Sequence, residues 1–305
     1  MLKLIGVELF KLRKRRMPYV LLLVLLAIVL IPVVVNYANY SSTLAKYPDI
    51  ESYITENSGG SMTIIPPPGG LPTEEREKML MASMLSQWKK TLVLPGAMES
   101  VFGSMSMFGM LLVVVLSASV VGSEYGWGTL RQMLAKGTSR NNYLTSKFLT
   151  VAIAVLAGVL LVVAAGLTAT LITSSLVEGG IGWNGFTAYF FGSLGRLLLA
   201  MSVYLAFAAL VAVVLRSAAM GMAVALAGWF GESTIVALLS SSSGWLAEAA
   251  RYTIGYNTNN LLALNALTPL GELEPWWRGV IILAVYIAAF LGAAYLLFRR
   301  QDLTT

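Results

Sequence analysis

Residues 18–37 read PYVLLLVLLAIVLIPVVVNY, a run of 20 residues without a charged side chain. About 20 consecutive apolar residues are enough for a helix to cross the hydrocarbon core of a bilayer. Further long runs that are mainly apolar lie near residues 98–121, 147–172, 188–214, 217–240 and 277–298. We therefore predict six transmembrane helices, with ends placed to within about 2–4 residues.

The composition agrees with a membrane protein. Hydrophobic residues make up 57% of the 305 residues and charged residues only 12%, whereas a soluble domain is about 45–50% apolar and about 25% charged. A signal peptide is the alternative for the first run, but its apolar core spans about 7–15 residues and ends at a small-residue cleavage site. The run here is longer and no such site follows. We expect one all-α polytopic membrane domain over residues 1–305.

The placement of lysine and arginine predicts the orientation. One set of span flanks holds 13 basic residues against three acids, and the opposite set holds seven basic residues against eleven acids. Because basic residues favour the cytoplasmic side, we expect a multi-pass protein of a bacterial or archaeal plasma membrane with both termini in the cytoplasm. We attribute the net charge of +6 to the basic residues of the cytoplasmic flanks. Binding of nucleic acid would require a basic face on a soluble domain, and the sequence indicates no such domain.

Three segments outside the spans carry further predictions. Residues 1–17 form an imperfect amphipathic helix that lies in the cytoplasmic interface, with an unstructured basic flank as the alternative. The outer loop 38–97 contains a helix over 73–94, with acids in its first turn and Lys89 and Lys90 near its end. The outer segment 241–276 is too long for a turn, and we expect it to contain re-entrant or interfacial helices.

Several chemistries are excluded by what the sequence lacks. The chain has no His and no Cys, so a Ser-His-Asp triad, a thiolate nucleophile and sites ligated by His or Cys are ruled out. It also has no Gly-Lys dipeptide, which the phosphate-binding loop of nucleoside triphosphatases requires. We expect no catalytic, cofactor-binding or metal site in this chain.

The inner loop 122–146 is the most informative segment. It begins GSEYGWGTLRQMLAKGTSR, and we predict a short helix closed by Gly137 and a second helix capped by Ser139. The pattern of this loop consists of Glu124, Gly128, Thr129, Leu130, Arg131, Ser139, Arg140, Tyr143, Leu144 and Lys147. This order resembles the signature of the type-two ABC exporter permeases, in which an acid ends the second span and G-T-L-R, S-R and a lysine follow. A plain topogenic loop with an excess of positive charge remains the alternative reading.

The resemblance covers the whole layout and implies a non-catalytic membrane subunit. It implies an N-terminal elbow helix, a cytoplasmic coupling helix in loop 122–146, and a separate ABC ATPase that binds ATP and magnesium. It further implies two ATPase copies and a second permease copy or paralogue. We carry the ATPase-coupling role over to these residues of the present sequence: Glu124, Gly128, Thr129, Leu130, Arg131, Arg140 and Lys147.

Two charged residues lie well inside predicted spans, away from the span ends. Arg196 and Glu232 sit at similar depth in the fourth and fifth spans, each about 12 Å below the outer surface at a rise of 1.5 Å per residue. An unpaired charge in the bilayer costs at least about 2.5–3.5 kcal/mol, so we expect the two to pair. The pair either lines a translocation path or locks the two spans together. Small residues in the fifth span favour either a dimer interface or packing within the chain, with the first span as a second dimer candidate.

The preferred function is export of an amphiphilic substrate such as a drug, peptide or lipid. The alternatives are a proton-coupled secondary transporter that uses Glu232, an intramembrane enzyme, and a membrane subunit that only anchors or regulates an ATPase. The lack of His argues against the enzyme. A partner ATPase would favour the exporter or the anchoring subunit over the proton-coupled secondary transporter.

Overall fold

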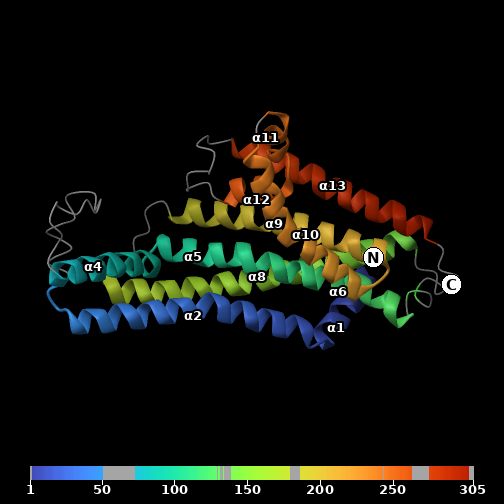
Figure 1. The fold of residues 1–305 in the computed structure, drawn as a ribbon. Helices are drawn as coiled ribbons and strands as arrows, with labels where there is room; N and C mark the ends of the chain where they lie inside the picture. The colour runs from blue at the N-terminus through green and yellow to red at the C-terminus, as the bar shows by residue number, and fades with distance from the viewer. Residues whose placement is uncertain are drawn as a thin grey trace. The chain divides into compact units, whose positions relative to one another are not determined.

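The computed structural model describes residues 2–50, 73–128, 130, 133, 139–178, 186–242, 244–262 and 275–301. In this part of the chain the regular structure is entirely helical (Figure 1). The helices in chain order are α1 (Leu2–Lys14), α2 (Met17–Lys46), α4 (Thr73–Leu92), α5 (Gly96–Ser104), the π-helix η1 (Met105–Gly109), α6 (Met110–Trp127), α8 (Arg140–Glu178), α9 (Phe186–Leu215), α10 (Ala218–Ser240), α11 (Trp245–Ala250), α12 (Ile254–Leu262) and α13 (Trp276–Arg300).

Six helical stretches are long and apolar enough to cross a membrane, which confirms the predicted number of spans. These stretches are Met17–Lys46, Gly96–Gly126, Arg140–Val177, Phe186–Leu215, Ala218–Ser240 and Trp276–Arg300. Several of them are longer than the apolar runs of the sequence. The 39 residues of α8 correspond to a length of about 58 Å at 1.5 Å per residue, roughly twice the thickness of a hydrocarbon core.

The chain divides into two compact units. The first comprises Met1–Leu25, Ser104–Leu161 and Phe191–Thr305, and the second comprises Leu26–Gly103 and Val162–Phe190. The prediction of one domain over residues 1–305 remains a prediction.

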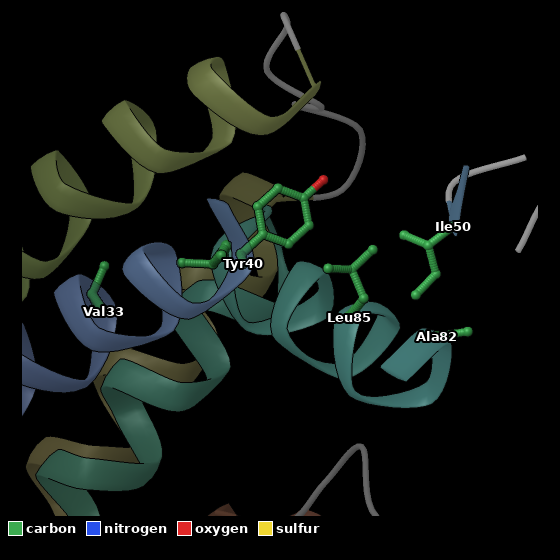
Figure 2. Packing of buried hydrophobic residues seen from close by; sticks show 6 residues of the cluster. Val33, Tyr40, Ile50, Ala82 and Leu85 are labelled. Carbon is green, nitrogen blue, oxygen red and sulfur yellow. The ribbon is translucent and has the colours of Figure 1, made fainter. Parts of the chain in front are cut away.

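The second unit has a core between α2 and α4. Its buried members are Val33, Tyr40, Ile50, Ala82, Leu85 and Leu92 (Figure 2). The helix α2 continues to Lys46, past the predicted end of the first span. The Ser41 and Ser42 hydroxyls in this extension donate to carbonyls of the preceding turn. This extension gives α4 an apolar surface against which its residues Ala82, Leu85 and Leu92 pack.

The first unit is packed closely through small residues. A Cβ atom built at Gly122 of α6 would lie 2.6 Å from the Cα of Ala218 at the start of α10. At Gly221 of α10 it would lie 2.9 Å from the Cα of Ala212 in α9. Such close approach of helix backbones is what small residues permit in membranes. The small face of α10 therefore serves packing within the chain.

A tight turn joins α9 to α10. Arg216 has a φ of 52°, in the left-handed region, and the Ser217 side chain accepts a hydrogen bond from the Met220 amide to cap α10. On the other side of α9, Val203 packs with Leu261 of α12 and Leu283 of α13 in a second buried cluster. The helices α11 and α12 lie in the segment where short helices are predicted.

Candidate functional site: the charge cluster beside the α6–α8 loop

The loop that carries the predicted coupling residues is framed by α6 and α8. Gly128 follows α6 with a φ of 64°, a left-handed conformation that glycine adopts at the end of a helix. The Ser139 hydroxyl accepts a hydrogen bond from the Asn142 amide at 3.2 Å, so it caps α8 as predicted. Leu130 is buried. Thr129 and Arg131 lie outside the described residues.

A buried cation stands at the centre of the site. The Lys147 side chain of α8 is 1% exposed, and its Nζ donates to Glu124 Oε1 of α6 at 2.6 Å. The same Nζ donates to Glu8 of α1. Both carboxylates are themselves almost fully buried. A buried charge is tolerated only when it is paired and hydrogen-bonded, and Lys147 meets this condition with two carboxylates from two different helices.

A second cation closes the cluster from the solvent side. Lys11 Nζ donates to Glu8 Oε1 at 2.9 Å and to Glu124 Oε1 at 3.0 Å. Burial by itself lowers the pKa of Lys11, but the hydrogen bonds and charges of the two glutamates outweigh burial and hold the pKa above its ordinary value of 10.5. Two cations thus balance two anions, and the cluster is neutral as a whole.

An aromatic residue completes the coordination of Glu124. The Tyr143 hydroxyl of α8 donates to Glu124, while its ring stacks on Phe298 of α13 with centroids 5.8 Å apart. Glu124 therefore receives hydrogen bonds from Lys11, Lys147 and Tyr143. The cluster connects α1 to α6 and α8, the two helices that flank the loop.

Arg140 has a separate set of partners at the C-terminal end of α13. Its Nη1 donates to the carbonyl oxygens of Arg299 at 2.9 Å and of Gln301 at 2.8 Å. The Gln301 amide group in turn donates to the Val213 carbonyl of α9 at 2.8 Å, and its side-chain oxygen accepts from Tyr125 at 3.0 Å. A cation at the last carbonyls of a helix is favourable, so Arg140 fixes the start of α8 against the end of α13.

The sequence pattern found only part of this site. Glu124 and Lys147 were predicted and meet directly, whereas Arg140 lies in the neighbouring network described above. Glu8 and Lys11 were not predicted as site residues. The signal that could have found them is their spacing of three residues, which places a carboxylate and an ammonium group on one face of a helix.

The structure does not form the predicted ion pair between Arg196 and Glu232, and the role of the two residues in a translocation path remains a prediction. In the described part of the chain no ion pair joins them. Arg196 donates to the Gly192 carbonyl at 3.0 Å and to the Ser193 hydroxyl at 3.2 Å, both on its own helix. Glu232 accepts from the Tyr204 hydroxyl at 3.0 Å and from the Gly255 amide at the start of α12. The N-terminus of a helix carries partial positive charge and so replaces the arginine as a partner of Glu232.

The chain also matches known proteins. The family model described as "ABC-2 family transporter protein" matches residues 4–303. The uncharacterized protein YhcI of Bacillus subtilis (strain 168) is 22% identical over 213 residues, which cover 63% of this chain and 64% of YhcI. The match therefore spans somewhat less than two thirds of the length of this curated relative. The resemblance seen in the α6–α8 loop is confirmed by the family match over nearly the whole sequence, and the chain belongs to the ABC-2 family of membrane transporter proteins.

Proposed function

We propose that this chain is the non-catalytic permease subunit of an ATP-driven exporter and that the loop between α6 and α8 is its contact with a separate ABC ATPase. Membership of the ABC-2 family supports such a partner in general. The observation that carries the assignment to this loop is the buried cluster of Glu8, Lys11, Glu124 and Lys147, which anchors both flanking helices to α1.

A loop that receives force from another protein needs rigid supports. Lys147 and Glu124 are too buried to touch a second protein, so their part in coupling is to hold α6 and α8 in position. Thr129 and Arg131 are the proposed contact residues. Motion of the ATPase at this loop would then pass to α6, α8 and α1 as one body, because the charges of the cluster are costly to separate in a buried site.

The remaining elements of the proposal follow the family layout. The helix α1 acts as the elbow helix at the cytoplasmic surface, and both termini face the cytoplasm of a plasma membrane. The partner binds ATP and magnesium, and this chain holds no cofactor of its own. Two permease chains and two ATPase chains form the transporter. An amphiphilic substrate fits the apolar character of the spans.

The first test is purification of the chain in detergent together with its candidate ATPase. Wild type is expected to form a stable complex with stimulated ATP hydrolysis. The double variant Thr129→Asp/Arg131→Glu is expected to lose both. A matched control is Ser86→Asp/Lys90→Glu, which makes the same charge change on exposed residues of α4 and should leave the complex intact. If wild type purifies alone with every ATPase encoded beside it, the proposal fails.

A further inference from the structure

A cavity of about 370 Å³ lies in the first unit, and none of the four residues of the charge cluster lines it. It is lined by the end of α1, the start of α2, and parts of η1, α6, α8 and α9. Its volume lies within the range of about 300–1,000 Å³ that small-molecule sites occupy. Residues on both sides of the junction between α1 and α2, at residues 15–16, therefore line the cavity.

The wall of the cavity is apolar over nearly its whole extent. Leu12, Leu22, Leu25, Leu112 and Val155 are representative of the lining, in which only Arg13 and Tyr19 carry polar side-chain atoms. An apolar cavity offers water too few hydrogen-bond partners to hold it, and an empty one forfeits the dispersion contacts of its lining. A hydrocarbon chain is the occupant that such a wall favours.

The charge at the cavity selects among amphiphiles. Arg13 lines it, and Lys14 and Arg16 are exposed on the same stretch. The apolar span of α2 begins at Met17, so this basic stretch lies at the membrane surface on the side of α1. Basic pockets between transmembrane helices at a membrane surface suit anionic lipid headgroups. Charge complementarity therefore points to an anionic lipid.

Part of the cavity wall is formed by an irregular helix. Gly109, the last residue of the π-helix η1, lines the cavity together with Met201 of α9. A Cβ at Gly109 would lie 2.6 Å from the Met201 Cε, so glycine is what allows the methionine to lie against the helix there. Single π-helical turns inside α-helices are frequent at functional sites. The π-helical turn therefore supports a binding site independently of the basic residues Arg13, Lys14 and Arg16.

We propose that the cavity binds one acyl chain of an anionic phospholipid from the leaflet that faces α1, with Arg13 at the headgroup phosphate. The lipid fills the space between α1, α2, α6 and α8 and so supports α1 against the spans. The proposal goes beyond the proposed export function and does not depend on the ATPase, so each can fail without the other.

The test uses the full chain in nanodiscs that contain equal amounts of phosphatidylglycerol and phosphatidylcholine, released for native mass spectrometry. Wild type is expected to retain one phosphatidylglycerol per chain in preference to phosphatidylcholine. Arg13→Gln should reduce this preference about fivefold, which corresponds to about 1 kcal/mol for one basic residue near the membrane surface. Arg16→Gln is the matched control, because Arg16 is exposed and does not line the cavity.

A second variant tests the cavity itself. A Cβ at Gly158 meets only Leu22 Cδ1, at 3.9 Å, so Gly158→Leu can extend its side chain into the cavity and should abolish retention of either lipid. Gly195→Leu is its control, since Gly195 of α9 faces open space. Equal retention by wild type, Arg13→Gln and Gly158→Leu would overturn the proposal, as would equal binding of both lipids to wild type.

Discussion

At the scale of single residues, Lys147 is a buried cation that is held by two buried carboxylates. Its ammonium group is almost fully buried and binds Glu8 and Glu124, which are buried as well. Removal of one partner from a buried ion pair typically costs about 3–5 kcal/mol, because the other charge stays buried without compensation. Lys11 binds the same two carboxylates, but its side chain is 34% exposed. Water can therefore replace part of the hydrogen bonding that Lys11 provides.

The two lysines are therefore expected to differ in their effect on stability. Lys147→Met should lower the thermal midpoint of the detergent-solubilised protein strongly, whereas Lys11→Met, with the same change of side chain, should lower it only slightly. Circular dichroism or a thermal-shift assay with an environment-sensitive dye measures both. Equal midpoints for the two variants would show that the buried position of Lys147 has no special energetic weight.

The raised pKa of Lys11 predicts how its contribution depends on pH. Because the pKa in the folded state lies above the ordinary value of 10.5, the stabilising effect is complete below about pH 10 and is lost as the pH rises through the folded pKa. The difference in stability between wild type and Lys11→Met should thus be constant from about pH 7 to about pH 10 and shrink above that. Thermal midpoints of both proteins across this range measure it, and a difference that grows at high pH would contradict the assignment.

At the scale of elements, two helix ends are held by charged side chains from elsewhere in the chain. Glu232 of α10 accepts the Gly255 amide at the N-terminal end of α12, and Arg140 of α8 donates to the last carbonyls of α13. Each charge has the sign that complements the helix dipole at its end. These contacts also explain why Glu232 needs no arginine partner.

Substitution of Glu232 should therefore loosen α12 specifically. A side-chain cap and a charge at a helix terminus are together worth about 1–2 kcal/mol. Hydrogen exchange of peptides over 254–262 should be faster in Glu232→Ala, by about tenfold for 1.4 kcal/mol. In Glu232→Gln, which keeps an acceptor oxygen, it should be only slightly faster. Peptides from α13 serve as the internal reference, and unchanged exchange in α12 of Glu232→Ala would refute the capping role.

At the scale of the whole molecule, hydropathy predicts the number of spans but not the lengths of the helices. A bilayer requires backbone groups to be satisfied within the segment, so each long apolar run becomes a helix. An apolar run in the sequence marks only the apolar part of such a helix. The helix α8 starts at Arg140 and α2 continues to Lys46, because polar residues at these ends find hydrogen bonds that hydropathy does not register.

The site was predictable only where its residues form a local motif. Glu124 and Lys147 flank the loop and share its pattern, whereas Glu8 joins them from α1, more than a hundred residues away in the chain. Equal depth in neighbouring spans does not bring Arg196 and Glu232 together, because the N-terminus of α12 supplies a partner for Glu232 that no hydropathy profile identifies.

The α6–α8 loop, held by the charge cluster, is the proposed contact with an ABC ATPase. The sequence contains no Cys, so a single introduced cysteine is the sole thiol in the chain. The most direct measurement compares Thr129→Cys in the loop with Ser86→Cys on α4, each treated in membranes with a short thiol-to-amine cross-linker in the presence of the ATPase. We predict a permease–ATPase adduct for Thr129→Cys and none for Ser86→Cys. The opposite pattern, or equal labelling at both positions, would contradict the account.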